Sequence, residues 1–199
     1  MTSRYTRCSV RNESVSIFKF KKRGGPHDLE ISMTGIKLGS NVLQISRSDG
    51  SFAAALAGIV GLSGRACAVV KTKAEAERFG RAAATAGVLL EIQIASPGEL
   101  PYNQESFDVV VIKNAIGEMV INDRVACLQQ AHRVLQSGGR CVVIEKAMRA
   151  GLGALVSKRT LDRRYVDDGG AQAALKAEGF RGVRLLAERD GVSFTEGTK

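Results

Sequence analysis

Several side chains that could do acid–base or anion-binding chemistry come directly after apolar, strand-like runs of this sequence. They are Arg47, Lys71, Lys113, Asn114, Glu118 and Glu145. In open α/β sheets ligands bind at the carboxyl ends of the strands, so a site is expected at these positions. Glu118 could act there as a general base. A solvated or helix-starting carboxylate is the simpler interpretation, and we name no catalytic residue.

Three basic residues, Arg47, Lys71 and Lys73, are expected at one mouth of the sheet. The helix that follows Asp49 begins at the same place, and a helix N-terminus carries a partial positive charge. The three cations therefore make a candidate anion-binding site, for example for a phosphate-bearing ligand. Ordinary solvated surface cations explain the same residues equally well.

Metal binding and Ser-His-Asp or Cys-His chemistry find little support in the sequence. The only histidines are His27 and His132, and His132 is expected to pack or to lie on a helix surface. The cysteines form no C-x-x-C pair, so no metal site is expected. They are Cys8, Cys67, Cys127 and Cys141. No catalytic triad can be proposed from two histidines placed in this way.

Strand-like runs alternate with helical patterns from residue 38 onward, which predicts βαβ units and a parallel sheet. The expected strands are 41–46, 65–70, 89–94, 107–113 and 140–145. Helices are expected from about residue 52, over 73–86, and from Val125 to a turn at 137–139. Further on, AQAALKAEGF predicts a short helix, and VRLLAE with VSFTEG predicts a hairpin around residues 189–191.

The chain of 199 residues is long enough for one sizeable core, and we expect a single domain over residues 36–199. Residues 1–35 are expected to form a basic N-terminal arm, with KFKKRGG at 19–25 as its densest cluster. A partly ordered, solvated arm is preferred here over a specific anion-binding arm.

The net charge of +9 permits acidic partners such as nucleic acid, but an aromatic content of 5% argues against stacking platforms for bases. No apolar run approaches the roughly 20 residues that cross a bilayer. The N-terminal residues lack the apolar core of a signal peptide. We therefore expect a cytoplasmic protein without a membrane span.

Five segments, in order, resemble the class I S-adenosylmethionine (SAM) methyltransferases, in particular the branch that includes the ubiquinone and menaquinone methyltransferases. The more specific segments are GIKLGSNVLQI, LPYNQESFDVVVIKNAI and HRVLQSGGRCVVIE, and weaker support comes from AALKAEGFRGVRLL and GVSFTEGTK. The resemblance covers residues 36–199. It implies an α/β, Rossmann-like class I methyltransferase fold, with a mostly parallel seven-stranded sheet, helices on both faces and a C-terminal antiparallel hairpin.

The resemblance also locates the first SAM-binding loop, which reads VLQISRSDG here. Gln44 stands at the position of the family's acid, Ser46 and Ser48 at two of its glycines, and Gly50 at the last glycine. In the family the glycines let the backbone approach the amino acid part of SAM, and each added Cβ restricts that approach. Neutral Gln44 cannot attract the ligand's ammonium group as the acid does.

Two other ligand positions of the family carry changed residues as well. Val70 replaces the acid that accepts hydrogen bonds from both ribose hydroxyls, and Ser96 replaces the acid that contacts the adenine amine. Asp108, which supports the strand and turn in the family, is present. Asn114 and Glu118 fall where the family lines its substrate pocket.

The framework segments match, whereas the ligand-facing acids are absent together. This contrast predicts a methyltransferase-like protein that has lost SAM binding and catalysis. It would serve as a binding, regulatory or assembly subunit with a protein partner or an anionic ligand, and no cofactor is expected. The alternative is an active SAM-dependent methyltransferase that acts on a small molecule through an atypical SAM site, and a weaker alternative is a nucleic-acid-binding module.

Overall fold

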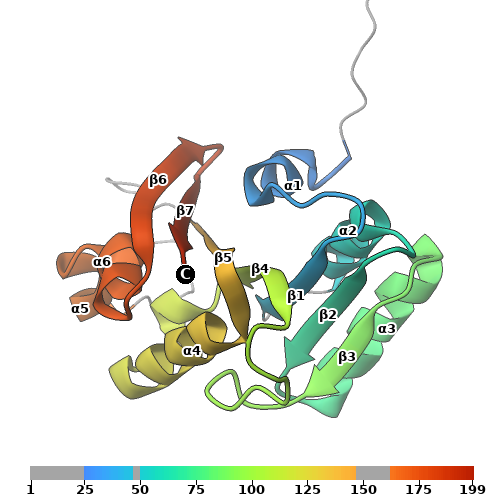
Figure 1. Cartoon of the computed structure of the whole chain (residues 1–199), viewed down its shortest axis with the longest axis horizontal. Helices are drawn as coiled ribbons and strands as arrows, with labels where there is room; N and C mark the ends of the chain where they lie inside the picture. The colour runs from blue at the N-terminus through green and yellow to red at the C-terminus, as the bar shows by residue number, and fades with distance from the viewer. Residues whose placement is uncertain (1–24, 47–49, 147–161) are drawn as a thin grey trace, which may run out of the picture.

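A single seven-stranded sheet organises the computed structural model, which describes residues 25–46, 50–146 and 162–199 (Figure 1). The strands are β1 Asn41–Ser46, β2 Arg65–Val70, β3 Glu91–Ile94, β4 Phe107–Lys113, β5 Leu135–Lys146, β6 Arg181–Arg189 and β7 Val192–Thr198. Their order across the sheet is β3-β2-β1-β4-β5-β7-β6. The strands β1 to β5 pair in parallel, whereas β7 is antiparallel to both β5 and β6.

Helices cover both faces of this sheet (Figure 1). They are α1 Asp28–Thr34, α2 Ser51–Val60, α3 Lys73–Ala86, α4 Ile121–Val134, α5 Arg163–Asp167 and α6 Gly170–Ala177, with a 3-10 turn η1 at Ile116–Glu118. On one face the core contains Phe52 of α2 and Phe79 of α3. On the other face it contains Leu128 of α4, Tyr165 of α5 and Leu175 of α6. This doubly wound arrangement, with its C-terminal hairpin, confirms the predicted fold class.

The central strand β4 is apolar on both faces. Val109 and Val111 join the core on the α2 side, and Val110 and Ile112 join the core on the α4 side. A near-continuous run of branched apolar residues is typical of a parallel strand buried on both faces. Strand β4 pairs in parallel with β1, so the carboxyl ends of these two strands lie side by side near the middle of the sheet.

Most predicted elements are present, and some boundaries differ. The strand at 107–113, the helix at 73–86 and the C-terminal hairpin are confirmed. The predicted turn at 137–139 is wrong, because β5 begins at Leu135 and runs through these residues. The pairing of β4 with β5 shifts between Phe107 and Val109, and such a bulge lets extra residues stay within a strand.

The end of the predicted basic arm packs against the domain. Residues 28–34 of that arm form α1, whose Leu29, Ile31 and Met33 lie against the core on the α2 side. Residues 1–24, with most of the KFKKRGG cluster, lie outside the described residues. Glu30 of α1 contacts Lys113 at the end of β4, so the first turn of α1 lies at the carboxyl end of the sheet.

Candidate functional site

The first predicted SAM position, Gln44, lies inside β1. It pairs with Ala68 of β2 and Val111 of β4 and is 1% exposed. Within the part of the chain that the structure describes, neither its amide oxygen nor its amide nitrogen has a hydrogen-bond partner. Burying an unpaired polar group is unfavourable, and an unpaired charge would be more so. Ser46, the last residue of β1, is buried as well.

Gly50, the one glycine of the family's loop pattern that this chain keeps, is required by packing. Its φ is +90°, and a Cβ at this position would lie 2.7 Å from the Cα of Phe79. Helix α2 begins at the next residue, so this glycine lets α2 start directly against α3. The rest of the loop, with Arg47, Ser48 and Asp49, lies outside the described residues.

Val70, at the position of the family's ribose-binding acid, is part of the core. It clusters with Ala53 of α2, Ala68 of β2 and Phe79 of α3, and it is 1% exposed. The following turn keeps a regular helix start, since Thr72 and Glu75 form a capping box at the N-terminus of α3. The local fold of the β2–α3 turn is thus intact, while the side chain at the ribose position is apolar and packed.

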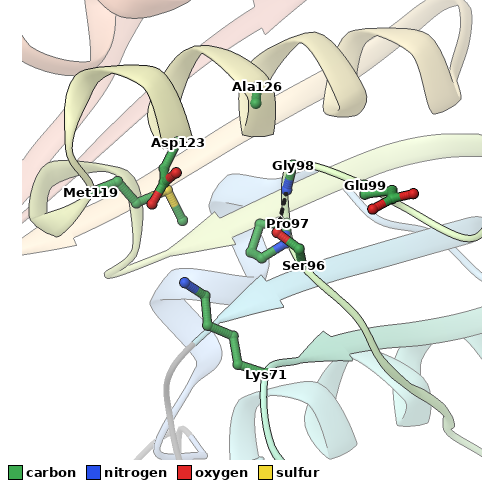
Figure 2. Close-up of a pocket in the computed structure, with 8 residues that line it drawn as sticks. All are labelled: Lys71, Ser96, Pro97, Gly98, Glu99, Met119, Asp123 and Ala126. Carbon is green, nitrogen blue, oxygen red and sulfur yellow. Dashed lines mark hydrogen bonds between the residues drawn. The ribbon is translucent and has the colours of Figure 1, made fainter.

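A cavity of about 250 Å³ opens at the ends of β2 and β3 (Figure 2). It is lined by Lys71, Ser96, Pro97, Gly98, Glu99, Met119, Asp123 and Ala126. Lys71 extends from the end of β2 toward Met119 and Asp123 on the α4 side. Ser96 and Gly98 also line the cavity, and the Oγ of Ser96 accepts a hydrogen bond from the backbone N–H of Gly98 at 3.3 Å.

This cavity brings together some of the predicted site residues and leaves others apart. Ser96 and Lys71 line it, whereas Lys73 begins α3 outside it. The lining carries one lysine and two carboxylates, those of Glu99 and Asp123. The charges around the cavity are therefore mixed, and the anion-binding site predicted at Arg47, Lys71 and Lys73 stays a prediction, because Arg47 lies outside the described residues.

Asn114 and Glu118 lie beyond the end of β4 and do not line this cavity. Asn114 has a φ of +50° and donates its backbone N–H to the carbonyl oxygen of Ile144 at 2.8 Å. Asparagine is one of the residues that tolerate this conformation, so the turn needs no glycine. Glu118 ends the turn η1 and is half-buried.

Glu145, at the end of β5, is a more enclosed carboxyl group in the same region. It accepts hydrogen bonds from the hydroxyl of Tyr165 at 2.6 Å and from the backbone N–H of Gly117 at 2.9 Å. Burial raises the pKa of Glu145 above its ordinary value, although these hydrogen bonds and the nearby Arg124 oppose the shift. The acid after the apolar run VVIE was visible in the sequence, but its partner Tyr165 lies 20 residues away and was missed.

An ion pair between Lys113 and Glu30 lies at the carboxyl edge of the sheet. Lys113 ends β4 and is the sheet neighbour of Ser46. Its Nζ lies 2.6 Å from Glu30 Oε2 of α1 and 4.2 Å from the centre of the Phe52 ring. The two charged side chains are only 9% and 18% exposed. The edge beside the first loop is therefore occupied by the protein's own charges.

In residues 25–46, 50–146 and 162–199, no group of three or more His, Cys, Asp or Glu side chains could hold a metal ion. The thiols of Cys67, Cys127 and Cys141 are free and buried. None of the helices in these ranges is long and apolar enough to cross a membrane.

Comparison with known proteins gives consistent matches. The family model described as "Methyltransferase domain" matches residues 43–143. The chain is 30% identical over 117 residues to the ubiquinone/menaquinone biosynthesis C-methyltransferase UbiE of Haemophilus ducreyi, covering 58% of this chain and 44% of that protein. It is 30% identical over 135 residues to UbiE of Hahella chejuensis, covering 66% and 51%. The chain thus spans about half the length of these curated relatives.

A solved structure supports the same assignment at the level of the fold. A SAM-dependent methyltransferase from Aquifex aeolicus superimposes with a TM-score of 0.68 at 17% identity, covering 89% of this chain and 95% of that one. The family match extends over half of the chain, and the strand order and C-terminal hairpin agree with it. The chain therefore belongs to the class I SAM-dependent methyltransferase family.

Proposed function

We propose that this protein does not bind SAM in the manner of its family and serves as a binding, regulatory or assembly subunit. Val70 is the observation that carries the proposal. At this position the family uses a carboxylate that accepts hydrogen bonds from both ribose hydroxyls, whereas Val70 presents methyl groups packed on Phe79. A hydrogen bond to a charged group contributes about 1.5–3 kcal/mol, so losing two weakens binding by roughly a hundredfold to ten-thousandfold.

The first loop supports the same conclusion. Gln44 is buried within β1, where it is not available to an ammonium group of a ligand. Lys113 and Glu30 form an ion pair beside Ser46, at the edge where the amino acid part of SAM would approach. Gly50 is accounted for by its contact with Phe79, so its presence does not argue for a cofactor.

The alternative, an active SAM-dependent methyltransferase that acts on a small molecule, is favoured by one observation. The cavity beside Ser96 remains open at the ends of β2 and β3, and its carboxylates at Asp123 and Glu99 could accept hydrogen bonds from a nucleoside. Its volume of about 250 Å³ is below the 300–1,000 Å³ typical of ligand pockets. The same mixed charges make an anionic ligand a weaker proposal, and nucleic acid binding has only the net charge in its favour.

Calorimetric titration of the whole chain with SAM and with S-adenosylhomocysteine tests this proposal. We expect no saturable heat at ligand concentrations up to about 1 mM, together with no rise in melting temperature. A double variant, Val70→Asp with Ser96→Asp, should gain measurable affinity for SAM. Val70→Ala with Ser96→Asp is the matched control, because it removes the same packing without adding the ribose carboxylate.

The wild-type titration decides the question even if the double variant does not fold. Saturable binding of SAM to the wild-type chain, with a dissociation constant below about 0.1 mM, would overturn the proposal and favour the alternative. A folded double variant that ignores SAM would show that more than the carboxylates is missing from the site.

A further inference from the structure

His27, Ser51 and Glu30 form a continuous hydrogen-bonded chain where α1 meets α2. His27 Nε2 lies 2.9 Å from Ser51 Oγ, and His27 Nδ1 lies 2.8 Å from Glu30 Oε2. The sequence alone offered no Ser-His-acid arrangement, and the structure places these three side chains in contact. Ser51 is 24 residues from His27 in the sequence, and only the docking of α1 beside α2 brings them together.

The order of these contacts is that of a serine nucleophile, its base and the group that orients the base. In the matching tautomer, the hydroxyl of Ser51 donates to His27 Nε2, and His27 Nδ1–H donates to the carboxylate of Glu30. Such a constellation is recognised by geometry and roles, not by sequence order. We propose that Ser51, His27 and Glu30 form a triad that attacks carboxylic esters, an activity separate from SAM and beyond the proposed binding role.

The start of α2 adds hydrogen-bond donors next to Ser51 in the sequence. The first backbone hydrogen bond of this helix runs from Ala54 N to Gly50 O at 3.0 Å. The N–H groups of Phe52 and Ala53 therefore belong to the first turn, where they have no partner within the helix. Such donors, beside the nucleophile, can stabilise the negative oxygen that develops on an attacked carbonyl.

The imidazole is fixed by more than one contact, and reagents can reach it. The ring of His27 packs edge-on against Phe52, with centroids 5.4 Å apart. The side chains of His27 and Glu30 are each 18% exposed, and Ser51 is half-buried. Lys113 binds the same oxygen of Glu30 at 2.6 Å, which holds the carboxylate in place but also competes with His27 for it. We therefore expect a slow esterase.

The chemical step balances with water as the only co-reactant. Ser51 Oγ forms a bond to the carbonyl carbon of the ester while its proton passes to His27 Nε2. The bond from carbon to the leaving alcohol oxygen breaks, and His27 returns the proton to that oxygen. Water then attacks the acyl-serine, gives a proton to His27, and releases the acid as Ser51 recovers its proton. The net reaction is ester plus water to acid plus alcohol.

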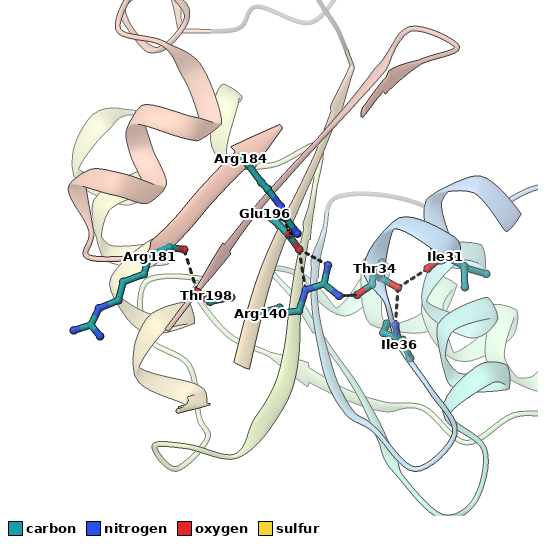
Figure 3. Close-up of polar contacts among 8 residues, drawn as sticks. All are labelled: Ile31, Thr34, Ile36, Arg140, Arg181, Arg184, Glu196 and Thr198. Atoms are coloured by element: carbon teal, nitrogen blue, oxygen red, sulfur yellow. Dashed lines mark hydrogen bonds and ion pairs between the residues drawn. The ribbon is translucent and has the colours of Figure 1, made fainter. Parts of the chain in front are cut away.

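A purely structural role is the competing explanation, since the same contacts hold α1 on the domain. Helix α1 has a second anchor at its other end, where the guanidinium of Arg140 donates to the carbonyl oxygen of Thr34 at 3.3 Å (Figure 3). Arg140 is held in turn by Glu196, which also binds Arg184 (Figure 3). Because of this second anchor, substitution of His27 is expected to leave α1 docked.

The test is covalent labelling of the whole chain by a small alkyl phosphonofluoridate, which forms a Ser O–P bond and releases fluoride. We expect a single adduct on Ser51, located by peptide mass spectrometry, in the native protein and not in urea. Ser51→Ala should abolish the adduct, and His27→Ala should slow labelling about a hundredfold or more. Added imidazole should partly restore labelling of His27→Ala, which a structural role would not produce.

Substitutions at Glu30 and Ser32 separate a positioning role from a structural one. Glu30 acts as a positioning residue, so Glu30→Gln should slow labelling and Glu30→Asp should recover part of the rate. Ser32→Ala is the matched control on α1, because Ser32 is exposed and its hydroxyl donates to Leu29 O of the same helix at 2.7 Å. The proposal is overturned if native wild-type protein gives no adduct on Ser51, or if a folded His27→Ala variant labels at the wild-type rate. The wild-type result decides even if a variant fails to fold.

Discussion

Replacing Gly50 with alanine separates a role in the fold from a role in cofactor binding. At a φ of +90°, the new Cβ would lie 2.7 Å from Phe79 Cα and 3.0 Å from Phe79 Cγ. The left-handed backbone costs a residue with a Cβ about 1–2 kcal/mol, and overpacking against α3 adds about 1–3 kcal/mol. We therefore expect Gly50→Ala to lose about 2–5 kcal/mol of unfolding free energy with no ligand present.

Gly87→Ala is the matched control for this change. Gly87 has a φ of +65°, and a Cβ there would meet no atom within 4 Å, so only the backbone cost of about 1–2 kcal/mol applies. Urea unfolding followed by circular dichroism, without added ligand, measures both variants. A loss for Gly50→Ala no larger than for Gly87→Ala would refute the packing argument and make a cofactor role the better explanation of this glycine.

Two predictions concern titrating groups. Burial alone would raise the pKa of Glu196, but hydrogen bonds from Arg140 and Arg184 outweigh it and lower that pKa (Figure 3). Its stabilising effect is thus complete above the ordinary carboxyl pKa and lost as pH falls through the lowered value, so urea unfolding of Glu196→Gln should depend less on acid pH than that of the wild type. Burial raises the pKa of Cys127 to about 12 and that of Cys141 still further. A thiol reagent at about pH 8 should leave both unmodified in the native protein and modify both in urea, as read by mass spectrometry.

The sheet could be predicted because its signals are local. The run at 107–113 is apolar from Val109 to Ile112, and the helix at 73–86 has its own capping residues, so each reveals its type within one window of sequence. The turn predicted at 137–139 was wrong because contacts with distant residues decide the structure there. SGG is a turn signal, but in the structure it lies in the bulge of β5 between the pairs Phe107–Leu135 and Val109–Arg140, and its glycines bond to the backbone of Lys199, far away in the sequence.

The site could be predicted only in part, because its contacts join distant residues. Family positions such as Val70 could be located, but its packing on Phe79 could not. The Lys113–Glu30 ion pair joins residues 83 positions apart, and the hydrophobic periodicity of a helix or strand does not predict such a contact. His27 was visible as a histidine without an evident role, and its meaning depends on where α1 docks.

The family-pattern residues that this chain keeps have structural explanations. The carboxylate of Asp108 accepts the backbone N–H of Asn41 at 2.6 Å and a hydrogen bond from Gln136, so it joins the starts of β1, β4 and β5. Gly50 is required by Phe79. The match over residues 43–143 therefore includes positions that the sheet needs with or without a ligand, and it supports the fold more strongly than SAM binding. The SAM titration and the labelling of Ser51 therefore test different residues, because the first depends on Val70 and Ser96 and the second on His27 and Glu30.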